Sequence, residues 1–185
     1  MANKLTVCGD LSASGTIYGT LDQVASGSVN TGTGTANTWA GCCAAKGIQA
    51  GATYNTAFGY HALSGLTTGD YNTAFGALSL CCNTTGNRNT GSGYRSLYNN
   101  TTGQYNSALG YSVLHNNTTG SANTAMGYAA MYYNTTSSYN VAIGNAALQD
   151  NTTGTCHTAI GVLALADSTT GVLNVAIGPN AGRKT

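Results

Sequence analysis

Charged residues are scarce in this chain. Its 185 residues include six Lys or Arg and five acidic residues, and glutamate is absent. So few charges exclude a basic patch for nucleic acid and a polybasic membrane anchor. No apolar run approaches the roughly 20 residues that a membrane-spanning helix needs. The first residues, Met1–Thr6, also lack the apolar segment of a secretion signal. We therefore expect neither nucleic-acid binding nor membrane insertion.

Several strong helix formers are also rare, because Glu is missing and Lys and Arg are few. Gly, Asn, Thr, Ser, Ala and Tyr dominate instead, and this composition favours β structure with many turns. A biased composition is also typical of disorder. Disordered segments, however, lack the strictly periodic large apolar residues that this chain contains. The composition therefore predicts an all-β fold.

A short motif, Asn-Thr-Ala-Phe-Gly at residues 55–59, recurs every 17 residues, which is the signature of a solenoid or fibre. An earlier, weaker copy begins 18 residues before it. Numbering each copy from 1 to 17, position 1 is Asn with one histidine exception: Asn37, Asn55, Asn72, Asn89, Asn106, Asn123, Asn140, His157 and Asn174. Position 5 is always glycine: Gly41, Gly59, Gly76, Gly93, Gly110, Gly127, Gly144, Gly161 and Gly178.

The remaining positions predict one coil of a β-solenoid. Position 3 is mostly Ala, positions 4 and 9 are mostly large and apolar, and positions 12 to 15 are mostly Asn-Thr-Thr-Gly. We expect strands at positions 1 to 5 and about 7 to 10, with the large residues of positions 4 and 9 forming the core. The small residues of positions 3 and 5 would then face a close backbone neighbour. Stacked Asn at position 1 would form an amide ladder, and Asn-Thr-Thr-Gly a turn whose Gly has positive φ.

The repeat also sets the domain boundaries. Residues 1–36 lie outside the period and are expected to be a β or connector segment used in assembly, since so small a segment cannot bury its own core. Residues 37–178 form a nine-coil solenoid, and residues 179–185 a short tail. A solenoid without a polar cap exposes backbone groups that template further pairing. Residues 1–36 of one molecule could therefore dock on the last coils of the next and form a head-to-tail filament.

Catalytic and metal chemistry have little support. The histidines His61, His115 and His157 occupy different repeat positions, and the aspartates share none. Without paired carboxylates we expect no enzyme, and we expect no cofactor and no metal. Six cysteines, with the vicinal pairs Cys42-Cys43 and Cys81-Cys82, lack zinc-ligand spacing. They are predicted to be small buried hydrophobes, with inter-chain disulfides as the alternative. Sequons such as Asn83-Thr-Thr and Asn151-Thr-Thr coincide with turns, and we interpret them first as turn chemistry.

Tyrosines recur at two repeat positions. Tyr54, Tyr71, Tyr105 and Tyr139 share position 17, and position 6 contains Tyr60, Tyr94, Tyr111 and Tyr128. Stacking along a ridge is the simplest interpretation of both rows. The alternative is that the position 6 row is a surface that binds glycans.

Two stretches of the repeat resemble known fibres. Asn-Val-Ala-Ile-Gly-Pro-Asn-Ala, residues 174–181, is similar to head repeats of trimeric autotransporter adhesins, which are intertwined trimers of left-handed β-rolls. Asn-Thr-Ala-Phe-Gly-Tyr-His-Ala-Leu, residues 55–63, resembles repeats of phage tail-fibre proteins, as does Leu-Thr-Val-Cys-Gly-Asp-Leu-Ser-Ala-Ser-Gly-Thr-Ile-Tyr-Gly, residues 5–19. Many such fibres end in an endosialidase-type chaperone domain, which we expect was cleaved away, omitted or never present here. The resemblance implies a homotrimer.

The predicted function is accordingly that of a structural fibre, a trimeric β-solenoid shaft in a virion or outside a cell. The alternative is a receptor-binding fibre tip or adhesin that recognises host-surface glycans. A third hypothesis, an ice-binding array, comes from the Thr-Thr pairs that recur from Thr67-Thr68 to Thr169-Thr170.

Overall fold

The computed structural model describes residues 36–183. Each coil contributes one short strand to the fold. The strands are β1 (Thr38–Ala40), β2 (Thr56–Phe58), β3 (Thr73–Phe75), β4 (Thr90–Ser92), β5 (Ser107–Tyr111), β6 (Thr124–Tyr128), β7 (Val141–Ile143), β8 (Thr158–Ile160) and β9 (Val175–Ile177). The predicted assembly segment 1–36 and Cys8 lie outside the described residues, apart from Ala36.

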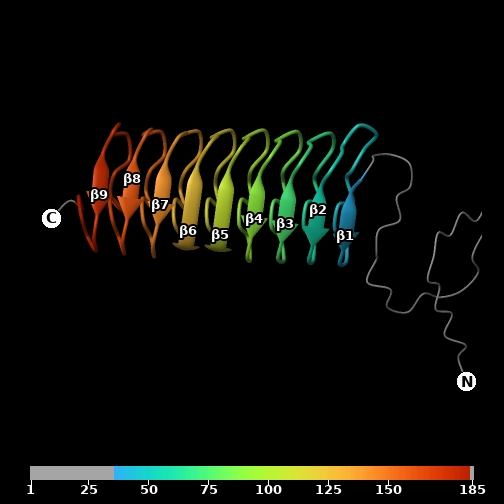
Figure 1. Ribbon diagram of the computed structural model, residues 1–185, viewed down its shortest axis with the longest axis horizontal. Helices are drawn as coiled ribbons and strands as arrows, with labels where there is room; N and C mark the ends of the chain where they lie inside the picture. Colours follow the sequence, from blue (N-terminus) through green and yellow to red (C-terminus); the bar gives the residue numbers. More distant parts are fainter. Residues whose placement is uncertain (1–35, 184–185) are drawn as a thin grey trace, which may run out of the picture.

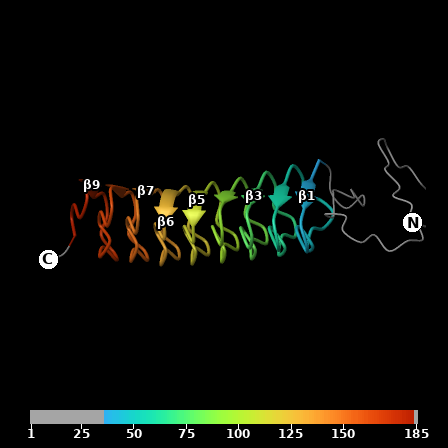
Figure 2. The same cartoon turned by 90° about the horizontal axis from the view of Figure 1, so that it is seen from below.

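All nine strands form one parallel sheet in sequence order, β1 to β9. Equivalent residues of successive coils pair, so that Thr56 lies beside Thr73 and Ala57 beside Ala74. The coils stack side by side along one axis (Figure 1), and the same single row appears from below (Figure 2). The protein is therefore an all-β parallel β-solenoid whose nine strands are linked by about eight complete coils, spaced about 17 residues apart, which confirms the predicted all-β solenoid; the trimer stays a prediction. Coil numbers below count the motif copies, so that coil 1 begins at Asn37 and coil 9 at Asn174.

The interior of the solenoid is narrow, and the strand contributes only small residues to it. At position 3, Ala57, Ala74 and Ala142 are at most 1% exposed. Position 9 contributes the large residues, and Leu63, Leu80 and the other members of that row are fully buried. Burying one such side chain stabilises the fold by roughly 1.5–3 kcal/mol. The core is built from these two rows and from the mostly small side chains of position 8.

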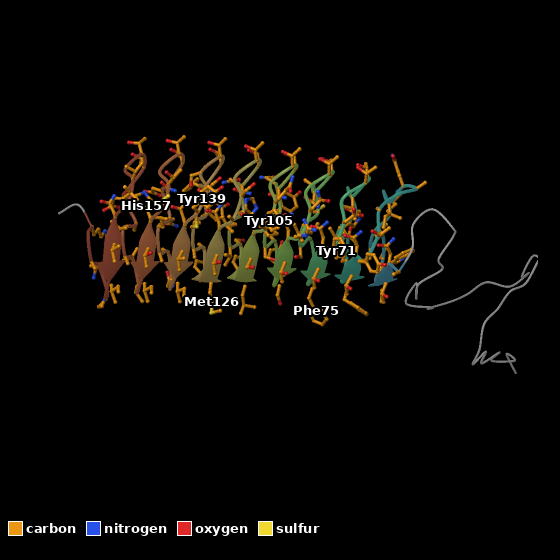
Figure 3. The ribbon with its side chains drawn as sticks, turned by 45° about the horizontal axis from the view of Figure 1, so that its top comes forward. Tyr71, Phe75, Tyr105, Met126, Tyr139 and His157 are labelled. Atoms are coloured by element: carbon orange, nitrogen blue, oxygen red, sulfur yellow. The ribbon has the colours of Figure 1, made fainter. Side chains whose placement is uncertain are left out.

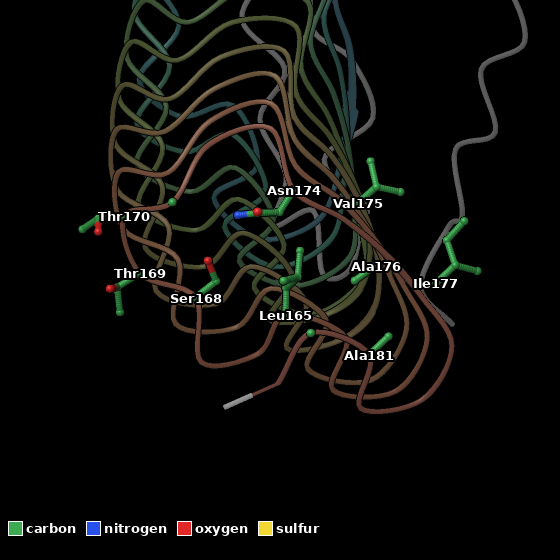
Figure 4. A pocket seen from close by; sticks show the side chains of 11 residues that line it. Leu165, Ser168, Thr169, Thr170, Asn174, Val175, Ala176, Ile177 and Ala181 are labelled. Carbon is green, nitrogen blue, oxygen red and sulfur yellow. The ribbon is translucent and has the colours of Figure 1, made fainter. Parts of the chain in front are cut away.

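The prediction for positions 3 and 4 was wrong. Position 4 was expected in the core, but Phe75 is 60% exposed and Met126 44% exposed. Both side chains project from the strands away from the coils (Figure 3). Since side chains alternate along a strand, the inward position is position 3, and only Ala or Gly fits there in coils 2 to 9. Figure 4 shows this alternation in β9, where Ala176 points into the coil and Val175 and Ile177 point out.

The predicted second strand at positions 7 to 10 is a turn instead. Its backbone is left-handed at positions 7 and 9 of nearly every coil, as at Leu78 (φ 61°) and Leu80 (φ 51°). A left-handed residue costs roughly 1–2 kcal/mol. The turn persists because its backbone bonds to neighbouring coils, as from the Leu80 N–H to the Ser96 carbonyl (3.0 Å). The same bond recurs at position 9 along the stack.

Glycine at position 5 is required by a close approach between coils. Gly76 has φ +132°, and a Cβ added there would lie 2.6 Å from the carbonyl oxygen of Gly93 in the next coil. Real Cβ atoms essentially never come so close. The same obstruction by the next glycine recurs from Gly41 to Gly161, so the small residue expected at position 5 does meet a neighbouring backbone, that of the next coil.

Candidate interaction surface

The outward side of the sheet exposes several large apolar side chains. We call it the outer strand face and define it by the residues at positions 2 and 4 of coils 2 to 9: Thr56, Phe58, Thr73, Phe75, Thr90, Ser92, Ser107, Leu109, Thr124, Met126, Val141, Ile143, Thr158, Ile160, Val175 and Ile177. These residues alternate with the inward Ala of position 3. The sheet therefore presents one row of mainly Thr and one row of mainly large apolar side chains.

Several of these large residues contact water over much of their surface. Leu109 is 46% exposed and Ile177 68% exposed, whereas Phe58, Ile143 and Ile160 are half-buried against their neighbours. No residue of the outer strand face is charged. A shallow apolar depression of about 260 Å³ lies at its centre, where Ser92 takes the place of a large residue. A contiguous apolar row of this kind marks an interaction site more often than an ordinary surface.

Stacked aromatic rows lie at the two ends of the strands. Before the strands, at position 17, Tyr54 stacks on Tyr71 with ring centroids 5.0 Å apart. Arg88 continues this row between Tyr71 and Tyr105, at 5.4 and 5.3 Å from the ring centroids. Its Nη1 also donates a 2.7 Å hydrogen bond to the Tyr105 hydroxyl. We call these four residues the Tyr71 ladder.

After the strands, position 6 forms a shorter row. Tyr94, Tyr111 and Tyr128 follow one another at 5.2 Å, and we call them the Tyr94 ladder. Tyr60 does not join it, because Ala77 separates the two, and its ring lies against His61 instead. The predicted binding group of four tyrosines is therefore three stacked residues and one separate residue. All four are exposed.

A third row, at position 10, was not predicted. Tyr98, His115 and Tyr132 stack at 5.2 and 4.9 Å, and we call them the Tyr98 ladder. Arg95, at position 7, lies between the two rows, 5.2 Å from the ring centroid of Tyr94 and 5.5 Å from that of Tyr98. Sequence inspection missed this row because a histidine interrupts its tyrosines.

The asparagines of position 1 form a continuous ladder in the interior. In each step, one side-chain oxygen accepts two bonds from the next coil: Asn55 Oδ1 accepts from the backbone N–H (2.8 Å) and the Nδ2 (3.1 Å) of Asn72. The Nδ2 of Asn72 also donates to the carbonyl of Gly86 (2.9 Å). From Asn37 to Asn140 these side chains are buried, whereas Asn174 is exposed. A buried polar row is stable because its groups are bonded.

His157 takes the place of asparagine in this ladder. Its N–H donates to Asn140 Oδ1 (2.9 Å), and its Nδ1 accepts from the N–H of Asn174 (3.3 Å), as an asparagine Oδ1 would. Nε2 is then the protonated nitrogen. It is buried and has no partner in hydrogen-bonding geometry among the described residues. Burial lowers the pKa of the His157 imidazole, and the backbone of Gly171 offsets part of that effect.

A second buried ladder runs through the Asn-Thr-Thr-Gly turns. Asn100 donates from Nδ2 to Asn83 Oδ1 (2.8 Å) and to the Gly103 carbonyl (3.0 Å). The turn glycines do not have positive φ, contrary to the prediction. They are glycine because a Cβ would collide, at Gly86 with Asn100 Nδ2 at 3.0 Å among other atoms. The identical Asn in five successive coils was the signal for this ladder.

The geometry of the turns bears on two hypotheses from the sequence, glycosylation of the sequons and ice binding by the Thr-Thr pairs. The sequon side chains Asn83 and Asn151 are fully buried, so the folded coil gives a glycosyltransferase no access to them. The first threonine of each pair from Thr67 to Thr152 is engaged, as Thr84 Oγ1 donates to the Thr101 carbonyl (3.1 Å). In these pairs only the second threonine, such as Thr85, is exposed, whereas Thr169 and Thr170 are both exposed. One row of hydroxyls is not the two-dimensional lattice that an ice-binding surface requires.

The cysteines are not the buried hydrophobes that were expected. Cys42 and Cys156 are exposed, Cys43, Cys81 and Cys82 are half-buried, and all five are free thiols. The Sγ atoms of Cys42 and Cys43 lie 3.6 Å apart. Hydrogen bonding to Cys43 raises the pKa of the Cys42 thiol, and burial raises that of Cys82. Raised pKa values keep these thiols protonated and less reactive.

The described residues contain no cluster of three potential metal ligands. Their acidic side chains serve local structure: Asp70 accepts from the N–H of Thr53 (2.7 Å), and Asp167 pairs with Arg183 (3.2 Å). No helix in the described part of the chain has the length and apolar character needed to cross a bilayer. A depression of about 670 Å³ lies at the last coil, beside Leu165 and Asn174 (Figure 4).

Comparison with family models, curated proteins and solved structures finds no match to this chain. The function must therefore be argued from the surface itself.

Proposed function

We propose that the protein is a structural fibre component in which three copies of the chain pack through their outer strand faces into a β-solenoid shaft. The observation behind this proposal is the uncharged row of large apolar side chains at position 4, from Phe58 to Ile177, which is interrupted at Ser92 and most exposed at Phe75, Leu109, Met126 and Ile177. Water contact with such a row is unfavourable by about 25 cal/mol per Å² of apolar surface. Covering it is therefore a substantial gain.

The spacing of the row favours another copy of the chain as the partner. Paired strands lie about 4.8 Å apart, so the outer side chains repeat at that interval along the solenoid. A second solenoid presents the same interval, and contacts made at one coil are then repeated at every coil. The face has no charges, so identical copies meet without electrostatic repulsion. The depression at Ser92 offers room for a large side chain of a neighbouring copy.

The number of copies follows from the resemblance of the repeat to tail-fibre and adhesin-head repeats, which implies a trimer. In a rod of three solenoids packed side by side, the continuous backbone hydrogen bonds of each solenoid transmit load along the axis. We place such a fibre on a virion or outside a cell. A receptor-binding tip remains the alternative role for the same architecture.

The test is the mass and shape of the 185-residue chain in solution. Light scattering coupled to gel filtration should give three times the 18.6 kDa of one chain, and electron microscopy should show rods. Replacing Leu109, Met126 and Ile143 together with threonine should shift the mass toward one chain while the β-sheet circular dichroism persists. A wild-type mass of one chain would refute the proposal.

A matched control is available on another surface. Tyr139 is 68% exposed but belongs to position 17 and not to the outer strand face. Tyr139→Thr removes a comparable exposed apolar side chain, and the trimer mass should survive it. Equal loss of the trimer in this control would mean that general hydrophobicity, not the outer strand face, holds the copies together.

A further inference from the structure

A polar groove of about 320 Å³ runs along the solenoid between two aromatic rows. Tyr111 and Tyr128 of the Tyr94 ladder form one wall, and Tyr132 with its neighbour Tyr133 forms the other. The rings of Tyr132 and Tyr133 meet edge to face at 4.8 Å. Arg95 and Gln149 also line the groove, from the coils on either side. Its volume lies at the low end of the range for ligand pockets, about 300–1,000 Å³.

The groove exists because position 7 is small in these coils. Ser112 and Ala129 occupy that position and form part of the lining. The same position is Leu78 in coil 3 and Leu163 in coil 8. A leucine at position 7 is thus compatible with the fold, and Ser112 and Ala129 leave the space between the two aromatic walls open.

Arg95 provides an unused cationic donor at this groove. Its guanidinium contacts the rings of Tyr94 and Tyr98 and the residue lines the groove. Its Nε is buried without a hydrogen-bond partner among the described residues, so a ligand would bind through the terminal Nη1 and Nη2 groups. The one salt bridge found in residues 36–183 joins Arg183 and Asp167, so no acidic side chain neutralises Arg95 there. A guanidinium held on aromatic faces keeps its edge available for a planar anion such as a carboxylate.

We propose that this groove binds an anionic saccharide, a ring of hydroxyl groups with a carboxylate or sulfate directed toward Arg95. A sugar ring presents apolar C–H faces to tyrosine rings and hydroxyl groups to the tyrosine hydroxyls and the Gln149 amide. A purely apolar ligand would leave these polar groups unpaired, which is costly. The site lies within one chain, so it does not depend on trimer formation.

The experiment is binding of the full-length chain to an array of neutral, carboxylated and sulfated glycans, followed by titration of the best ligand. Binding should be confined to acidic glycans and should weaken with added salt. Arg95→Gln should reduce affinity about tenfold or more, the loss of one charge-assisted bidentate contact. Ala129→Leu should reduce it at least as much by filling the groove. Carboxylated and sulfated probes separate the two possible anionic groups.

Arg88→Gln is the matched control, because Arg88 also lies between two tyrosines but is bonded to Tyr105 and does not line the groove. Its affinity should equal that of the wild type. Equal loss in Arg88→Gln, unchanged binding in Ala129→Leu, or capture of acidic peptides but no glycan would each overturn the proposal. Gel-filtration mass measured on the same samples separates failure of this site from failure of the trimer.

Discussion

The two faces of the same strands follow opposite rules. Facing inward, position 3 is alanine in most coils and is buried; facing outward, position 4 is Phe, Leu, Met or Ile in most coils and is exposed or half-buried. An ordinary sheet packs its large residues inward. Here the interior is shared with the position 9 leucines and two asparagine ladders, which leave room for a methyl group only. We infer that the fold of one chain depends on the inner rows, and the trimer that we propose would depend on the outer row.

Gly76→Ala should have the largest effect, because it attacks the stacking that creates both faces. A methyl group 2.6 Å from the Gly93 oxygen forces the coils apart, and φ +132° adds strain. Overpacking and backbone strain together should cost roughly 2–6 kcal/mol, measured by urea unfolding. Gly51→Ala is the control: its φ is +107° but nothing lies within 4 Å. Equal losses in the two variants would show that strain, not close approach, fixes glycine at position 5.

Two Leu→Ala variants compare a buried core position directly with a position on the outer strand face. Leu114 is fully buried and Leu109 is 46% exposed. Leu114→Ala should lower the free energy of unfolding by about 2–5 kcal/mol, independently of protein concentration. Leu109→Ala should cost little in the single chain, but its deficit relative to wild type should grow with concentration as the trimer is populated. The reverse concentration dependence would contradict the assignment of the two faces.

Much of the fold could be predicted from the sequence, because a strict repeat forces equivalent residues to stack. The period predicted a strand at positions 1 to 5, of which positions 2 to 4 form it in most coils, and it also predicted the polar character of position 1 and the close approach at Gly76. Which face is inward could not be predicted, since Phe75 and Ala74 alternate in either orientation and hydrophobicity alone favours the wrong one. The cross-section of the coil decides which face points inward, and this cross-section depends on left-handed turn residues such as Leu80.

The groove beside Arg95 was beyond prediction for a similar reason. Tyr111 and Tyr128 were recognised as a repeating row, but their opposite wall comes from position 10, where His115 breaks the pattern. The depth of the groove depends on position 7 of two coils, where Ser112 and Ala129 are smaller than a leucine. Such a feature becomes visible only when the coils are placed side by side.

Asn106→Ala tests the polar part of the interior. Its Oδ1 accepts from the N–H and Nδ2 of Asn123, both at 3.1 Å, and its Nδ2 donates to the Gly120 carbonyl (2.8 Å). Removal leaves these buried groups without partners, and we expect a loss of about 2–4 kcal/mol in denaturant unfolding. Asn145→Ala, at an exposed outer position, should change stability by less than about 0.5 kcal/mol. Comparable losses would mean that the ladder contributes no more than a surface amide.

His157 gives the smallest effect and the one that depends on pH. Burial lowers the pKa of its imidazole below the ordinary value of 6.5, so the unfolded chain binds a proton more readily than the folded chain. Stability then rises with pH where the unfolded state holds more protons. The contribution is fully present above about pH 6.5 and is lost as the pH falls through the lower, folded-state value.

His157→Asn restores the residue of the other coils and should remove this part of the dependence. As the pH is lowered from 7.5 to 5, the urea midpoint should fall less steeply in the variant than in the wild type. Identical pH profiles would show that the imidazole inside the ladder titrates as it does in the unfolded chain.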